Sequence, residues 1–183
     1  MNRQKELGKI SENIKNCTKC RLWKNRVMAV PGEGNVNSSL MFIGESPGEK
    51  ENRTGRPFVG RSGKLLDEFM TLNDIKRKNV YLTSIIKCHP PKNRNPKTDE
   101  LNTCIKNWLN KQIKIINPSL IVLLGRVAVK SMTGKNKVGR YHGKIISKED
   151  MDFFITYHPA AGLRNPKFRK NMEHDFNKIK KHI

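Results

Sequence analysis

The chain contains four cysteines, and their spacing is the first feature that could support chemistry. Cys17 and Cys20 form a C-x2-C pair, whereas Cys88 and Cys104 follow much further along the chain. Four thiolates can hold a tetrahedral zinc ion or an iron–sulfur cluster. Zinc ribbons usually use a second C-x2-C pair, which this sequence lacks, so the pattern favours a cluster. A buried structural Cys104 and a thioredoxin-like redox pair at Cys17 and Cys20 are the alternatives.

The charge of the chain indicates the kind of partner it binds. Lysine and arginine number 37 against 16 aspartates and glutamates, a formal net charge of +21 at pH 7. Such a field attracts polyanions, and DNA or RNA fits it best; a lysine-rich surface kept for solubility is the alternative. No apolar run reaches the roughly 18 residues of a membrane span, and the polar N-terminus does not resemble a signal peptide. We therefore expect no membrane partner and a cytoplasmic location.

The elements that must position these residues follow from the apolar pattern. Runs rich in β-branched and aromatic residues predict strands at 39–45, 80–88, 119–125 and 152–158. Helical spacing of apolar residues predicts helices at 62–72, 98–113, 126–132 and 166–179. This alternation predicts an α/β fold, a three-layer α/β/α sandwich around a mostly parallel, four-stranded sheet. We expect residues 1–183 to form a single, monomeric domain with the cysteine pair in its N-terminal segment.

Polar segments rich in glycine and proline follow three of the predicted strands. They are "GESPG" after the first strand, "KCHPPKNRNP" at the second and "HPAAGLRNP" after the fourth. Ligands of parallel α/β sheets bind beyond the carboxyl ends of the strands. The sequence therefore predicts that these segments meet at one edge of the sheet and form the functional site.

Several of these stretches, taken in order, resemble the family 4 uracil-DNA glycosylases, the iron–sulfur type. They are the C-x2-C pair, "FIGESPGEKENRTGRPFVGRSGKLLD", "VYLTSIIKCHPPKNRNP", Cys104 in the next helix and "YHPAAGLRNP". Together they span 17–166, which is most of the chain. The resemblance implies a three-layer α/β/α fold and hydrolysis of the bond between uracil and deoxyribose. It also implies a structural 4Fe–4S cluster held by Cys17, Cys20, Cys88 and Cys104.

The resemblance also implies catalytic roles at the strand ends. A neutral His158 would donate a hydrogen bond to O2 of the departing uracil. Glu45 would orient the attacking water and stabilise positive charge on the sugar. Phe58 would stack on the base once the base has left the duplex, although without the motif it would be read as a core residue.

Neighbouring residues would bind the base and the DNA. Backbone amides of the loop that holds Gly44, Glu45 and Ser46 would bind the uracil oxygens. Glu51 matches the family position that crowds C5 and excludes the thymine methyl group; a solvated surface glutamate is the alternative. Phosphate contacts and the wedge that fills the vacated stack would come from Arg94, Leu163 and Arg164. Ordinary basic surface is the alternative for these loops.

Ser84 departs from the family pattern, which usually has asparagine at this position. An asparagine amide can donate and accept along the edge of uracil, whereas a serine hydroxyl cannot form that pair. We therefore expect weaker uracil excision, or selectivity broadened toward other deaminated bases, unless a water beside Ser84 restores the second contact.

Two functions from other classes compete with the glycosylase. A nucleic-acid-binding module with a structural four-cysteine metal site would share the charge and the cysteines, but it would not need Glu45, Phe58 and His158 near strand ends. A zinc-dependent base deaminase needs an H-x-E and P-C-x-x-C arrangement. No histidine accompanies Cys17 and Cys20 in that pattern.

Overall fold

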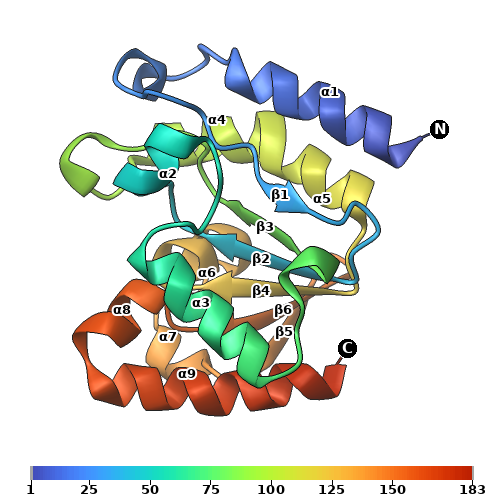
Figure 1. Cartoon of the computed structure of the whole chain (residues 1–183), viewed down its shortest axis with the longest axis vertical. Coiled ribbons are helices and arrows are strands. Elements are labelled where there is room, and N and C mark those ends of the chain that lie inside the picture. Colours follow the sequence, from blue (N-terminus) through green and yellow to red (C-terminus); the bar gives the residue numbers. More distant parts are fainter. Residues whose placement is uncertain (1, 183) are drawn as a thin grey trace.

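The computed structural model describes residues 2–182, and a six-stranded sheet lies at its centre (Figure 1). The strand order is β1-β3-β2-β4-β6-β5. The four inner strands are parallel, and β1 and β5 pair antiparallel at the two edges. The strands are β1 (Glu33–Gly34), β2 (Leu40–Gly44), β3 (Tyr81–Ser84), β4 (Leu120–Leu124), β5 (Ile145–Lys148) and β6 (Met151–Thr156).

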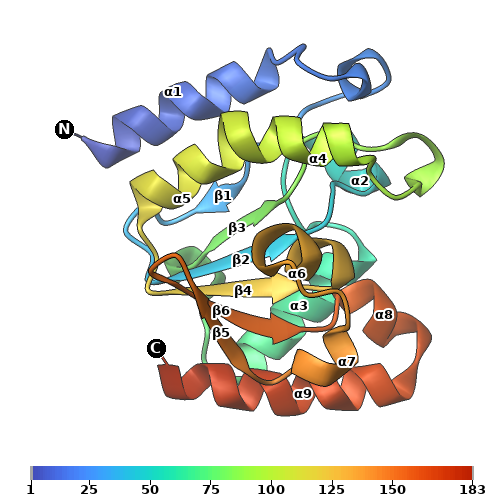
Figure 2. The ribbon, with the colours of Figure 1, turned by 180° about the vertical axis from the view of Figure 1, so that it is seen from behind.

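Helices cover both sides of the sheet, with α1, α4 and α5 along one side and α8 and α9 along the other (Figures 1 and 2). The helices are α1 (Arg3–Lys15), α2 (Glu49–Thr54), α3 (Arg61–Leu72), α4 (Thr98–Cys104), α5 (Asn110–Ile116), α6 (Arg126–Thr133), α7 (Val138–Tyr141), α8 (Pro159–Arg164) and α9 (Pro166–Ile179). A π-helical turn (Ile105–Leu109) joins α4 to α5. The α/β class is therefore confirmed. No helix within residues 2–182 is long and apolar enough to cross a membrane.

Strand β2 shows why its sequence is apolar throughout. Met41 and Ile43 belong to the apolar cluster that also contains residues of α1, α5 and α6. Leu40 and Phe42 belong to the second cluster, with residues of α3 and α9. Successive side chains of a strand point to opposite faces, so a strand covered on both faces needs apolar residues at every position. All residues of β2 are buried, as this arrangement requires.

The sheet has six strands where the sequence predicts four, because neither edge strand carries a long apolar run. Strand β1 has only two residues, and β5 is partly exposed along its whole length. Short, half-exposed edge strands lack the pattern that identifies a central strand. Helix α1 was also not expected, because its sequence is mostly polar and only Leu7 and Ile14 are buried.

Two boundaries next to the site differ from the sequence prediction. Strand β3 ends at Ser84, so the prediction that Cys88 ends a strand is wrong. The next two backbone N–H groups donate to the carbonyls of Gly44 and Glu45, at 2.9 and 3.2 Å, which draws the chain across the end of β2. In addition, the expected loop after His158 is the short helix α8, which the imidazole caps.

Candidate active site and cysteine pocket

The ends of three parallel strands bring Gly44, Ser84 and His158 to the same edge of the sheet. Gly44 ends β2 and lies opposite Ser84, the last residue of β3. Strand β6 ends at Thr156, beside β4, and His158 follows two residues later. This is the edge at which parallel α/β sheets bind their ligands.

Phe58 lies directly over Gly44. A Cβ atom at position 44 would come within 2.7 Å of Cζ of the Phe58 ring and within 3.7 Å of Nε2 of His158. A side chain larger than hydrogen would therefore push the ring off the strand end. The Phe58 ring and the imidazole of His158 therefore both lie close to Gly44 at this edge.

His158 is a neutral imidazole with a fixed tautomer. The N–H of Ala160 donates to Nδ1 at 3.1 Å, so Nδ1 is an acceptor and the ring proton lies on Nε2. Burial, followed by the positive charge of Arg164, lowers the pKa of His158 to about 4, while Glu51 acts in the opposite direction. At neutral pH the ring is therefore uncharged and can donate a hydrogen bond from Nε2, the atom nearest Gly44.

Glu45 is half-buried at the end of β2. Burial raises the pKa of this carboxyl, and the positive charge of Arg126, the first residue of α6, opposes that shift. The backbone N–H groups of Glu45 and Ser46 donate to no other backbone group within residues 2–182. A carboxyl with a raised pKa is suited to orienting a water molecule. The free N–H donors beside it are suited to binding carbonyl oxygens.

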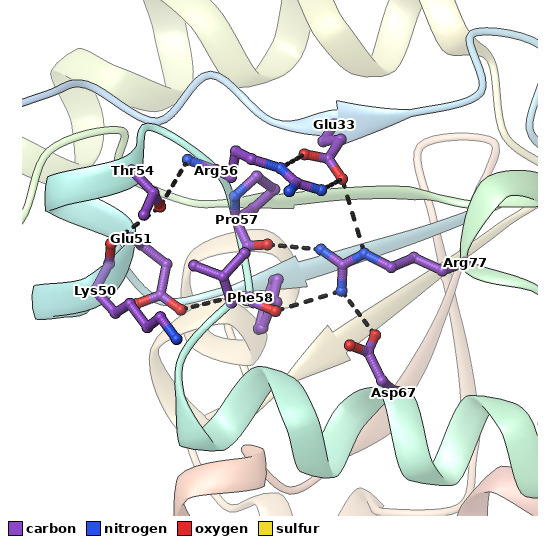
Figure 3. Close-up of polar contacts among 10 residues, drawn as sticks. Glu33, Lys50, Glu51, Thr54, Arg56, Pro57, Phe58, Asp67 and Arg77 are labelled. Carbon is purple, nitrogen blue, oxygen red and sulfur yellow. Dashed lines mark hydrogen bonds and ion pairs between the residues drawn. The ribbon is translucent and has the colours of Figure 1, made fainter.

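Glu51 fixes the loop that carries Phe58 (Figure 3). Its Oε1 accepts hydrogen bonds from the N–H groups of Val59 and Gly60, at 2.8 and 2.7 Å. The carboxylate also lies against Gly48, where a Cβ atom would come within 2.7 Å of Oε2. Glu51 therefore has a structural task in the free protein, and its predicted contact with C5 of uracil stays a prediction.

The sequence interpretation missed Lys87, a fully buried lysine that contacts the end of β3. Its Nζ donates to Oγ1 of Thr83 at 2.6 Å and to the carbonyl of Ser84 at 2.7 Å. Burial lowers the pKa of Lys87 to about 7, and the negative charge of Cys104 and Cys88, when they are ionised, opposes the shift. A signal was present, because this lysine is the only charged residue in the apolar run 80–88.

The residues expected to contact DNA occupy two different settings. Leu163 is 39% exposed on α8, the helix that begins beside His158, and Arg164 is exposed at the end of that helix. Arg94 already forms two hydrogen bonds with the buried carboxylate of Glu100, at 2.9 and 2.6 Å. The guanidinium of Arg94 therefore already has a protein partner, whereas the side chains of Leu163 and Arg164 are exposed on α8.

All four cysteines line one pocket and are free thiols. Two N–H donors from the pocket wall reach sulfur atoms: Nη1 of Arg26 lies 3.2 Å from Sγ of Cys88, and Nε1 of Trp108 lies 3.3 Å from Sγ of Cys17. Within residues 2–182 no group of three or more His, Cys, Asp or Glu side chains is arranged to hold a single metal ion. The structure thus places the four thiols around one pocket.

Burial keeps three of these thiols protonated in the free protein. It raises the pKa of Cys20 and Cys88, and raises the pKa of Cys104 to about 12. A metal binds the thiolate, so occupation of the pocket must release protons. The N–H donors of Arg26 and Trp108 are the kind of groups that stabilise metal-bound sulfur.

Comparison with known proteins defines first the class and then the family. The family model of the uracil DNA glycosylase superfamily matches residues 31–180, a span that holds all the strand-end residues described above. The type-4 uracil-DNA glycosylase of Sulfurisphaera tokodaii is 44% identical to this chain, over 95% of the chain and 83% of the relative. The type-4 enzymes of Saccharolobus solfataricus and Thermotoga maritima are 43% and 41% identical, over 95% of this chain and 85% and 93% of their own lengths. The chain therefore belongs to the type-4 uracil-DNA glycosylases, and the family resemblance is confirmed.

Proposed function

We propose that this protein flips uracil out of DNA and hydrolyses its N-glycosidic bond, leaving an abasic site. The meeting of Phe58, Gly44 and a neutral His158 at one strand end carries the proposal, because it combines a stacking surface with a hydrogen-bond donor. The type-4 relatives, which are named uracil-DNA glycosylases, support it. A base inside a duplex is out of reach of these groups, so it must leave the stack before the bond is broken.

His158 stabilises the leaving base. As the bond to the sugar breaks, negative charge develops on the uracil, chiefly at O2. The N–H at Nε2 of His158 donates to that oxygen, while Ala160 holds the other ring nitrogen. A neutral donor already in place needs no reorganisation as the charge develops, which makes such a contact effective in a site that excludes water.

Glu45 acts on the sugar and on the attacking water. Its carboxylate accepts a hydrogen bond from the attacking water at the strand end and stabilises positive charge on the deoxyribose as the base departs. The free N–H groups of Glu45 and Ser46 bind the uracil oxygens. The raised pKa of Glu45 brings its basicity closer to the pH at which the enzyme works.

Stacking and edge contacts divide the recognition of the base between them. The Phe58 ring stacks on any flipped base, since every base has an aromatic face. Selectivity therefore depends on Ser84, which faces the polar edge, and on Glu51, which closes the side of C5. Ser84 supplies fewer hydrogen bonds than asparagine would, so activity on other deaminated bases is the expected departure from strict uracil specificity.

Cys17, Cys20, Cys88 and Cys104 hold a 4Fe–4S cluster in this proposal. When bound, the cluster supplies a structural link and no electron, because hydrolysis of an N-glycosidic bond transfers none. The link joins the segment after α1 to the loop after β3 and to the end of α4. The shared pocket and its N–H donors support this assignment.

The protein engages DNA as a monomer in this proposal, with its charge of +21 providing the attraction. Leu163 and Arg164, exposed on α8, fill the space that the flipped base leaves. Arg94 contributes to phosphate binding through the part of its guanidinium that Glu100 leaves free. The expected cytoplasmic location accords with such an enzyme.

Incubation with an oligonucleotide that contains a single uracil, followed by alkaline cleavage, tests the proposal. We expect strand cleavage at the uracil position and none in the matched thymine oligonucleotide. The competing function, a nucleic-acid-binding module with a structural metal site, predicts binding of both oligonucleotides and no cleavage of either.

A further inference from the structure

Phe58 has a backbone conformation that a bulky residue rarely adopts. Its φ is +51°, in the left-handed region. Such conformations persist where the surrounding contacts impose them, and they concentrate at functional sites. The contacts that impose this one come from outside the Phe58 loop (Figure 3).

Arg77 holds the loop from one side. Its Nη2 donates to the carbonyl of Pro57 at 2.7 Å, and its Nη1 approaches the carbonyl of Phe58 at 3.3 Å. The guanidinium is itself anchored, because Nη1 pairs with Asp67 of α3 at 2.7 Å and Nε lies 3.8 Å from Glu33 of β1. A planar guanidinium can make these contacts together, whereas an ammonium group cannot.

The loop is held from two further directions. Glu51 of α2 accepts the next two backbone N–H groups, those of Val59 and Gly60. Gly63 of α3 lies so close that a Cβ atom there would come within 1.9 Å of the carbonyl oxygen of Phe58. Separate elements therefore fix the carbonyls of Pro57 and Phe58 and the two N–H groups that follow them. The Phe58 ring itself lies over Gly44.

We propose that Arg77 is a positioning residue for base stacking, which holds the Phe58 ring over the strand end before the flipped base arrives. The role rests on the proposed function. Arg77 donates to the carbonyls of Pro57 and Phe58, so it acts on the ring through the backbone of the loop. A ring already in place does not have to be ordered when the base binds, which favours binding.

The expected effect is on substrate binding. Stacking holds the base equally in the bound state and in the transition state, so its loss raises KM and leaves kcat nearly unchanged. Arg77→Ala should raise the KM for uracil DNA about tenfold in steady-state excision, the effect of about one hydrogen bond. General loss of folded protein would instead lower the maximal rate.

Arg56→Ala is the matched control. Arg56 belongs to the same network and makes two hydrogen bonds to Glu33, at 2.7 and 2.9 Å, but its guanidinium donates to no carbonyl of the loop. Its removal should leave the KM for uracil DNA near that of wild type. Thermal unfolding of each variant checks that the fold is retained.

A double-mutant cycle with Phe58→Ala decides whether Arg77 acts through the ring. The effect of Arg77→Ala should disappear in the Phe58→Ala background, since there is no ring left to position. An equal effect in both backgrounds, or none in either, would overturn the role. If Arg77→Ala does not fold, Arg77→Lys completes the cycle. Lysine keeps the positive charge beside Asp67 but lacks the planar guanidinium that reaches both loop carbonyls. Wild-type protein that leaves uracil DNA intact would refute the proposed function itself, which separates the two outcomes.

Discussion

At the scale of single residues, burial shifts the pKa values of Glu45 and His158 in opposite directions, and the separate tasks proposed for them rest on this difference. Burial disfavours the charged form of each group, so it raises the pKa of the carboxyl and lowers that of the imidazole to about 4. His158 is thus neutral above about pH 4, and the carboxyl of Glu45 loses its proton at a higher pH than an exposed glutamate does.

Excision should therefore weaken as the pH falls through the raised pKa of Glu45. Protonation removes the carboxylate that orients water, whereas His158 keeps its neutral form until about pH 4. The profile of kcat/KM against pH should show one acid limb above pH 4, and Glu45→Gln should lose that limb together with most of the activity. An unchanged acid limb in Glu45→Gln would assign the titration to another group.

Ser84→Asn should raise uracil excision roughly tenfold, because one recovered hydrogen bond contributes about 1–1.5 kcal/mol. It should also reduce any activity on hypoxanthine or xanthine, whose larger rings need the space that serine leaves. Single-turnover excision from uracil, hypoxanthine and xanthine oligonucleotides compares the two proteins. Slower uracil excision by the variant would mean that Ser84 is adapted to this pocket, for instance through an ordered water.

At the scale of elements, the inner strands could be predicted from their continuous apolar runs, and α3, α6 and α9 from the helical spacing of their apolar residues. The same pattern predicts the edge of the sheet that holds the site, because the polar segments follow the carboxyl ends of the apolar strands. The end of β3 could not be predicted, because Ile85 and Ile86 continue the apolar run although their N–H groups bond to the end of β2. Contacts between distant segments, such as those of Arg77 with the Phe58 loop, leave no local pattern at all.

The cysteine pocket gives a prediction at this scale, because its ligands come from different elements. Cys104→Ser should abolish bound iron and absorbance near ~400 nm, the expected range for thiolate-to-iron charge transfer. It should also lower the unfolding temperature, since the segment after α1 loses its link to α4. Iron analysis, absorbance and thermal unfolding check this.

Thr103→Ala is the control for that variant, because Thr103 lines the same pocket and carries no thiol. Its iron content should equal that of wild type. Wild-type protein prepared anaerobically with iron supplied, and found to hold stoichiometric zinc without iron, would contradict the cluster.

At the scale of the whole molecule, the charge of +21 should govern DNA affinity. Each phosphate contacted releases counterions, so the logarithm of the binding constant should fall with the logarithm of salt by a slope of about 0.9 per contact. Titrations of uracil and thymine duplexes at several salt concentrations measure this slope. An affinity independent of salt would remove the electrostatic basis of DNA binding, whatever the catalytic result.

The most direct test of the whole account is single-turnover uracil excision by wild type and by His158→Ala, both prepared in the same way with iron supplied. We predict that the variant folds and binds DNA as wild type does but excises uracil about 10²–10³ times more slowly, the loss expected for one preorganised donor to a developing anion. Equal excision rates from a correctly folded variant would contradict the role of His158, and with it the site on which the proposed function rests.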